Sequence, residues 1–266
     1  MRIDALLFDV DGTLADTEEA HRIAFNAAFE RAGLDWRWQP REYRRLLEVT
    51  GGKERIRGYI GALPVGDGER RRLLERVSAL HEDKTRIYTR IVRDGGVRLR
   101  PGVERLMREA LAAGCRLAIA TTTSAVNVQA LLEATLGARG LDWFSAIACG
   151  DQALRKKPAP DIHQLALARL GIEPARAVAI EDSLNGLRAA RAAGLWTLVT
   201  PNFWTEGADF EREGAGLVLP HLGEPALPLA GEPGHRLRHA AWLRFDELTR
   251  AALSHRVDAA AGVMQA

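Results

Sequence analysis

Short apolar runs alternate with segments of helical periodicity over most of the chain. The first apolar run, at 5–8, lies within an expected strand over 3–9. Four more follow much later, at 116–120, 145–149, 177–180 and 195–199. Segments with apolar residues three and four positions apart precede or follow these later runs, at 102–113, 125–136, 160–170 and 184–193. Short apolar strands that alternate with helices are typical of βαβ units, so the pattern predicts an α/β fold with a parallel sheet.

The stretch between the first strand and the second carries no strand signal. Its apolar residues recur with helical spacing, which predicts a helix over 18–33 and further helices over 40–92. Breaks are expected at Gly51-Gly52 and at 61–68, and residues 69–92 are predicted to form one long amphipathic helix. Because strand 3–9 must pair with strands that begin near residue 116, this all-helical stretch is an insertion.

The predicted domain organisation follows from that insertion. We expect a discontinuous α/β core of residues 1–15 and 93–225, an inserted helical cap at 16–92, and hinges near 14–17 and 92–97. The C-terminal extension, 226–266, has no pattern that assigns a function. We expect it to pack on the core, with an amphipathic helix over 237–253.

Composition excludes several classes of protein. The 266 residues are 47% hydrophobic and 27% charged, with a formal net charge of only +2, so nothing favours general binding to nucleic acid or membranes. No apolar run of about 18 residues could span a bilayer, and the N-terminal residues lack the pattern of an export signal. The two cysteines, Cys115 and Cys149, are expected to be buried free thiols, which fits a cytoplasmic protein. We expect a monomer.

The most informative motif follows directly on the first strand. Asp9 and Asp11 stand two residues apart, and Gly12 allows a sharp turn after them. Like charges so close together need a cation between them or a proton on one of them. The pair can hold Mg²⁺ while one carboxylate serves as nucleophile and the other as proton donor. The alternative is a structural turn that Asp11 caps.

Two further motifs suit an anionic ligand. Thr121 and Thr122 end the second strand where a helix begins, and the free N–H groups of a helix start bind phosphate. The alternative there is a plain helix cap by Ser124. Lys157, beside Pro158 after the third strand, can neutralise phosphoryl charge, although a solvated lysine is the simpler interpretation.

A second acidic pair ends the strand at 177–180. Glu181 and Asp182 follow it directly, and buried paired acids need a cation. Asp182 is the expected direct metal ligand and Glu181 its outer partner. The alternative is two acids favoured by the N-terminal dipole of the following helix.

The predicted cap offers residues for a second anionic group. Gly51 and Gly52 permit close approach of a backbone to a ligand, and Lys53 and Arg55 add positive charge around Glu54. The alternative is a helix start with surface charges. Two more residues, Glu18 and Tyr43, could hydrogen-bond sugar hydroxyls. His21 is expected to be structural or solvated.

Taken together and in this order, the four core motifs resemble those of the haloacid dehalogenase superfamily of phosphohydrolases. The position of the insertion is similar to that in members with a helical cap, which implies a Rossmann-like parallel sheet core. A closer likeness, to the CbbY proteins, covers about residues 1–225. The segments that carry it are 15–21, 36–38, Tyr43, 50–56, 120–124 and 181–188.

The resemblance implies a Mg²⁺-dependent phosphatase that acts through an aspartyl-phosphate. Asp9 would be the nucleophile and Asp11 the acid and base. Mg²⁺ would be held by Asp9, the backbone carbonyl of Asp11 and Asp182. The implied substrate is a small phosphorylated sugar, xylulose 1,5-bisphosphate or a similar pentulose bisphosphate, which links the protein to carbon fixation and the Calvin cycle.

Other functions stay open at this point. A mutase of the β-phosphoglucomutase kind uses the same aspartyl-phosphate, and phosphoglycolate phosphatase needs no second phosphate site. Haloalkanoic dehalogenation is disfavoured because it has no role for Asp11 as an acid. A non-enzymatic binding module would have lost a catalytic group, and none of the expected groups is missing.

Overall fold

The computed structural model describes residues 2–230, 237 and 241–263, and in these ranges it contains one parallel sheet. The strand order is β3-β2-β1-β4-β5-β6, and every neighbouring pair is parallel. The strands are β1 (Ala5–Phe8), β2 (Arg116–Ala120), β3 (Phe144–Ala148), β4 (Ala177–Glu181), β5 (Trp196–Val199) and β6 (Leu217–Val218). The predicted parallel α/β fold is therefore confirmed.

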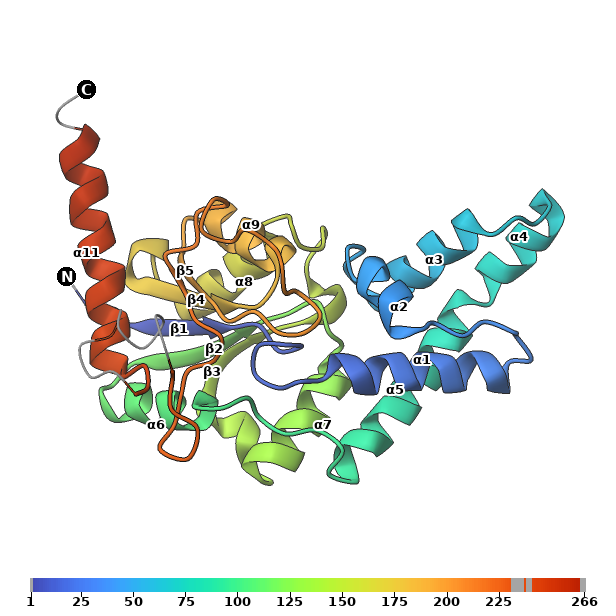
Figure 1. Cartoon of the computed structure of the whole chain (residues 1–266), viewed down its shortest axis with the longest axis horizontal. Helices are drawn as coiled ribbons and strands as arrows, with labels where there is room; N and C mark the ends of the chain where they lie inside the picture. Colours follow the sequence, from blue (N-terminus) through green and yellow to red (C-terminus); the bar gives the residue numbers. More distant parts are fainter. Residues whose placement is uncertain (1, 231–236, 238–240, 264–266) are drawn as a thin grey trace.

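Helices cover both faces of the sheet (Figure 1). Successive residues of β1 point to opposite faces, so Leu6 and Phe8 join one hydrophobic core while Ala5 and Leu7 join the other. The first core is closed by α6 (Val103–Ala112), α7 (Ala125–Leu136) and α11 (Phe245–Val263). The second is closed by α8 (Asp161–Leu170) and α9 (Leu184–Ala192). Short 3-10 turns lie at Gly140–Trp143, Gly150–Gln152 and Pro174–Arg176.

A block of helices between β1 and α6 lies beyond the carboxyl ends of the strands (Figure 1). The block has its own aromatic core, in which Phe25, Phe29, Trp38 and Tyr43 are each almost fully buried. Its long helix α5 also packs against α7 of the sheet layer. The helices are α1 (Glu18–Arg31), α2 (Pro40–Leu46), α3 (Gly52–Ala62), α4 (Asp67–Glu75) and α5 (Val77–Arg93).

The prediction of one helix over 69–92 is wrong, because the chain breaks between α4 and α5 at Arg76. The Arg76 backbone N–H donates to the carbonyl of Leu73, three residues back, which is a tighter turn than an α-helix makes. The Arg76 side chain donates at 2.6 Å to the carbonyl of Ala32, just after α1. At this break the chain thus contacts the end of α1, and local periodicity does not record such a contact.

The bounds predicted for the terminal helix are also wrong. Helix α11 covers Phe245–Val263, whereas 237–253 was expected. Leu243 precedes the helix, and its N–H donates at 2.8 Å to the carbonyl of Leu222. The buried residues Leu243, Leu248 and Ala252 pack into the first core of the sheet.

Three smaller observations complete the fold. β6 has only two residues and was not predicted, since so short a strand leaves no pattern. Cys115 and Cys149 are free and buried, as expected. In the described ranges, no helix has both the length and the apolar character that crossing a bilayer requires.

Candidate active site

The polar motifs predicted from the sequence meet at one edge of the sheet. Asp9 follows β1, Thr121 follows β2, and Asp182 follows β4. Because β1 lies between β2 and β4, the carboxyl ends of these three strands are neighbours. Lys157 comes from the loop after β3 and reaches the same place. Sheet order therefore brings together residues that are up to 173 positions apart in the chain.

A buried ion cluster forms the centre of the site. Lys157 Nζ donates to Asp9 Oδ1 at 2.7 Å and to Glu181 Oε1 at 2.8 Å. Burial raises the pKa of Asp9 to about 7, although the charge of Lys157 opposes this shift. Burial also opposes the charged form of Lys157, but the charges of Asp9 and Glu181 outweigh it and raise the pKa of Lys157. Lys157 therefore stays charged between the two carboxyl groups.

Glu181 has a second partner that sequence reasoning missed. Nε2 of His163, on α8, lies 2.9 Å from Glu181 Oε1, and both side chains are fully buried. Burial lowers the pKa of His163, so the ring is neutral and donates from Nε2. Burial opposes the ionisation of Glu181, but Lys157 and His163 lower its pKa. No local pattern marks His163, because an apolar helix face with one histidine is common.

Three carboxyl groups could hold a cation. Oxygens of Asp9, Glu181 and Asp182 lie within 4.8 Å of one another, and all three residues are buried. The pKa of Asp182 is raised well above its usual value by burial and by the charges of Asp9 and Glu181. Lys157 bonds to two of these acids, Asp9 and Glu181, and a divalent cation would supply further positive charge beside Asp182.

The carboxylate of Asp11 lies outside this acidic group and faces the helical block. Its Oδ1 accepts from Thr17 Oγ1 at 2.7 Å and from His21 Nε2 at 2.9 Å, and its Oδ2 accepts from Thr123. Burial opposes the ionisation of Asp11, but His21 and the hydrogen bonds from Thr123 and Thr17 hold its pKa well below the usual range. A metal contact through the Asp11 backbone carbonyl remains a prediction.

His21 is not a solvated residue. Lys84 Nζ lies 2.6 Å from His21 Nδ1, and an ammonium group can only donate, so Nδ1 accepts and Nε2 carries the proton toward Asp11. Burial and the charge of Lys84 lower the pKa of His21, and burial lowers the pKa of Lys84 to about 8. The spacing of Thr17 and His21 on one helix face was a usable signal, whereas nothing local marks Lys84.

The predicted cap residues lie across a cavity from this cluster. Gly51 has a φ of +96° at the start of α3, a conformation that favours glycine, and a Cβ on Gly52 would collide with His81. Both glycines, with Lys53, Glu54 and Arg55, line the cavity. Its volume is about 1460 Å³. The core residues that line it include Asp9, Asp11, Thr121, Thr122, Lys157 and Asp182.

Tyr43 does not face this cavity, which corrects the expectation that it binds a sugar hydroxyl. Its side chain is fully buried, and its hydroxyl donates to Glu18 Oε2 at 2.8 Å and accepts from Arg55 NH1 at 3.1 Å. Glu18 and Arg55 do line the cavity. Tyr43 therefore positions these two side chains from behind.

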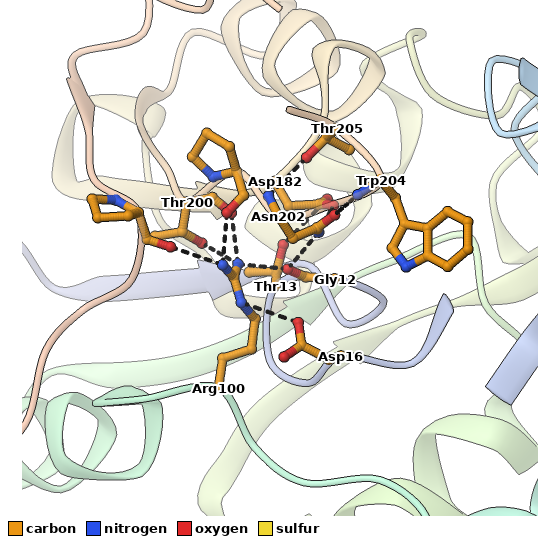
Figure 2. Close-up of polar contacts among 11 residues, drawn as sticks. Gly12, Thr13, Asp16, Arg100, Asp182, Thr200, Asn202, Trp204 and Thr205 are labelled. Atoms are coloured by element: carbon orange, nitrogen blue, oxygen red, sulfur yellow. Dashed lines mark hydrogen bonds and ion pairs between the residues drawn. The ribbon is translucent and has the colours of Figure 1, made fainter. Parts of the chain in front are cut away.

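A further residue that the sequence did not indicate is Arg100, which fixes the turn after β1 (Figure 2). Its guanidinium group is buried and donates to the carbonyls of Gly12 at 2.7 Å, Thr200 at 2.6 Å and Pro201 at 2.7 Å. An ion pair of 3.4 Å joins it to Asp16. Arg100 thus ties the loop of the first acidic motif to the loop after β5.

Comparison with known proteins agrees with this geometry. A model of the haloacid dehalogenase-like hydrolases matches residues 3–194. The plasmid CbbY protein of Cupriavidus necator is 51% identical, over 91% of this chain and 96% of that protein. A crystal structure of CbbY from Rhodobacter sphaeroides in complex with phosphate is 47% identical, with a TM-score of 0.75 over 82% of this chain and 94% of that one.

A variant of the same Rhodobacter sphaeroides protein has been crystallised in complex with xylulose 1,5-bisphosphate. It is 46% identical to this chain, with a TM-score of 0.76, and the match covers 84% of this chain and 98% of that one. Both the family match and these identities over most of the length exceed what a shared fold alone would give. The chain therefore belongs to the haloacid dehalogenase-like hydrolases and, among them, to the CbbY proteins.

Proposed function

We propose that the protein is a Mg²⁺-dependent sugar-bisphosphate phosphatase that acts through an aspartyl-phosphate, on xylulose 1,5-bisphosphate or a similar pentulose bisphosphate. The observation that carries this proposal is the buried group of Asp9, Lys157 and Asp182 beside a cavity of about 1460 Å³. The complex of the CbbY relative with xylulose 1,5-bisphosphate supports the substrate class.

The donor set fits Mg²⁺. Carboxylate oxygens are hard ligands, and the three carboxyl groups within 4.8 Å offer no nitrogen or sulfur from His or Cys. Asp9 and Asp182 would hold the ion directly, with the Asp11 carbonyl, while Glu181 would act from the outer side. When bound, the ion would offset charge on the transferring phosphoryl group. Burial raises the pKa values of Asp9 and Asp182, and neighbouring carboxylates add to both shifts, so a bound cation would stabilise the ionised forms of the two groups.

Asp9 would attack phosphorus in line, so that a new bond forms to its carboxylate oxygen as the bond to the sugar oxygen breaks. Asp11 would give its proton to that leaving oxygen. It would then take a proton from the water that attacks the aspartyl-phosphate, and inorganic phosphate would leave with Asp9 regenerated. The low pKa of Asp11 suits the second step. The negative charge of an incoming phosphate would raise the pKa of Asp11, so that it carries a proton for the first step, protonation of the leaving oxygen.

The transferring phosphate would lie between Lys157 and the start of α7. Thr121 is buried there and lines the cavity together with Thr122. Ser124 occupies the cap position of α7, but its hydroxyl makes no cap hydrogen bond and has no partner among the described residues. This corrects the view of Ser124 as a simple helix cap. The free N–H groups of α7 support phosphate binding at this point.

The helical block would select the substrate. Gly51, Gly52, Lys53 and Arg55 line the wall opposite the ion cluster, where a second phosphate would bind, and Glu18 would contact a sugar hydroxyl. We propose that residues 16–92 act as the cap over a core of 1–15 and 93–225, and that it opens near 14–17 and 92–97 to admit substrate.

A phosphate-release assay tests the proposal. The panel is xylulose 1,5-bisphosphate, ribulose 1,5-bisphosphate, fructose 1,6-bisphosphate, β-glucose 1-phosphate and phosphoglycolate. We expect the pentulose bisphosphates to be the best substrates, and we expect both EDTA and Asp9→Asn to abolish release. Undiminished turnover in either case would refute the mechanism.

Two alternatives are separated by further measurements. Phosphorus NMR of the products distinguishes a mutase, which yields an isomer, from a phosphatase, which yields free phosphate. If the protein is a phosphoglycolate phosphatase, Lys53→Ala should not reduce activity on bisphosphates more than activity on phosphoglycolate. We further propose a cytoplasmic monomer with a role in carbon fixation (the Calvin cycle), and gel filtration tests its oligomeric state.

A further inference from the structure

The loop after β5 joins the acidic cluster to the helical block. Asn202 donates from Nδ2 to Asp182 Oδ2 at 2.7 Å and to the Gly12 carbonyl at 3.2 Å. Its Oδ1 accepts from the backbone N–H of Trp204 at 2.8 Å. Figure 2 shows the amide beside Asp182, with the Trp204 ring extending away from it. Both amide donors and the amide acceptor are thus in use, and the Trp204 N–H determines which way the amide faces.

This loop has little freedom to move. The Asn202 N–H donates to Thr205 Oγ1 at 3.0 Å, and the Asn202 carbonyl accepts from the N–H of Glu206 at 2.8 Å. On the other side, the Gly12 carbonyl that accepts from Asn202 also accepts from Arg100. A Cβ at Gly12 would collide with Asp182 and Asn202, so the close approach of these groups requires glycine there.

The same loop contacts α2. The ring of Trp204 lies edge-on to Tyr43, with the centroids 5.5 Å apart and the planes at 89°, and it packs on the aromatic core of the helical block. The neighbouring Arg44 donates to the carbonyl of Glu206. By contrast, Phe203 is 62% exposed and its ring meets only Trp204 among the aromatic contacts of the described residues. Within this one loop, Asn202 therefore contacts the acidic cluster and Trp204 contacts the helical block.

We propose that Asn202 is a positioning residue for Asp182 and that Trp204 connects it to the position of α2. Asn202 holds the carboxylate of Asp182 in the orientation that receives a divalent cation. Trp204 holds Asn202 by its N–H and α2 by its ring, so that cation binding and closure of the helical block favour each other. This inference rests on the proposed function, since it assigns Asp182 to the cation site.

The first experiment measures Mg²⁺ binding without any substrate, by isothermal titration calorimetry. Asn202→Ala is expected to weaken Mg²⁺ binding about tenfold or more, the usual effect of losing a group that orients a metal ligand. Asn202→Ser keeps one hydroxyl donor and should recover part of the affinity. Phe203→Leu, a change in the same loop at a side chain that is 62% exposed, is the control. Equal affinities for Asn202→Ala and the wild type would overturn the proposal.

The second experiment measures how Mg²⁺ affects α2, by hydrogen–deuterium exchange with mass spectrometry on peptides that cover 40–46. We expect Mg²⁺ to slow exchange there in the wild type and in Phe203→Leu. In Trp204→Leu the backbone N–H to Asn202 remains, so Mg²⁺ should bind within about twofold of wild type while the protection of α2 is lost. Protection that persists in Trp204→Leu would refute the connection to α2.

Both experiments are independent of turnover. If no sugar bisphosphate is hydrolysed but Asn202→Ala still weakens Mg²⁺ binding, the proposed function fails and the role of Asn202 stands. If bisphosphates are hydrolysed but Asn202→Ala binds Mg²⁺ normally, the proposed function stands and the role of Asn202 fails. Thermal melting in EDTA shows whether each variant is folded, and if Asn202→Ala is not, Asn202→Ser decides the outcome by the same comparison.

Discussion

Lys157→Met provides the sharpest test of the charge balance in the site. Lys157 makes hydrogen bonds of 2.7 and 2.8 Å to Asp9 and Glu181, and all three groups are buried. Methionine has a similar length and no charge, so it leaves the carboxyl groups without their cation. Breaking a buried ion pair by removing one partner costs about 3–5 kcal/mol. We expect the free energy of unfolding of the metal-free protein to fall by about this amount at pH 8.

The loss should depend on pH, and its sign follows from Asp9. At pH 5 Asp9 is largely protonated in the wild type, because burial raises its pKa to about 7, so Lys157 then serves mainly Glu181. At pH 8 Asp9 is ionised, and Lys157 offsets both charges. Without Lys157 the pKa of Asp9 rises further, and each unit of that rise costs about 1.4 kcal/mol above the pKa. The deficit of the variant is therefore larger at pH 8 than at pH 5.

Urea denaturation in EDTA at pH 5 and pH 8, followed by circular dichroism, measures both quantities. Lys156→Met is the control at the neighbouring position, where the side chain is only partly buried and its Nζ donates at 2.6 Å to the carbonyl of Gly150. We expect that control to change stability by less than about 1 kcal/mol at either pH. A deficit of Lys157→Met that is absent at pH 8, or that shrinks as the pH rises, would refute the reasoning.

Three other outcomes are expected. Gly12→Ala should abolish phosphate release, because φ is +83° there and the added methyl group collides with Asp182; an active variant would contradict this geometry. Mg²⁺ should raise the melting temperature of the wild type but not of Asp182→Asn, as differential scanning fluorimetry can show. Burial lowers the pKa of Lys84 to about 8, so Lys84 loses its charge above that pH. A neutral amine no longer fixes the His21 tautomer that donates from Nε2 to Asp11, and kcat should therefore fall above pH 8. Lys84→Met should remove that limb from the pH profile, and an unchanged limb would exclude Lys84 as its cause.

The predicted strands and most helices were close to the observed ones because their signals are local. Apolar runs at 116–120 and 177–180 correspond to β2 and β4 within a residue, since burial on both faces of a sheet leaves a continuous hydrophobic run. The break at Arg76 and the start of α11 at Phe245 were missed. Hydrogen bonds to distant segments lie at both places: Arg76 bonds to Ala32, and near the start of α11 Leu243 bonds to Leu222 and the Phe245 N–H to Glu109.

In the candidate site, too, residues that belong to local motifs could be predicted and residues that depend on distant contacts could not. Asp9, Asp11, Lys157 and Asp182 could be predicted because each follows a strand, and parallel strands end at one edge of the sheet. Their supporting groups could not be predicted. His163 and Lys84 come from helices whose local patterns are ordinary, and Asn202 lies in a loop with no motif.

The sequence by itself determined the α/β class, the helical insertion and the polar motifs that meet at one edge of the sheet, because periodicity and short motifs are properties of neighbouring positions. Only the tertiary structure decided the charge states and orientations of those residues. Asp11 is ionised because Thr17 and His21, at the start of α1, and Thr123, after β2, converge on it. Tyr43 lies behind the cavity wall because the aromatic core of the helical block buries it. Burial and distant partners set both properties, and neither is encoded in the spacing of residues along the chain.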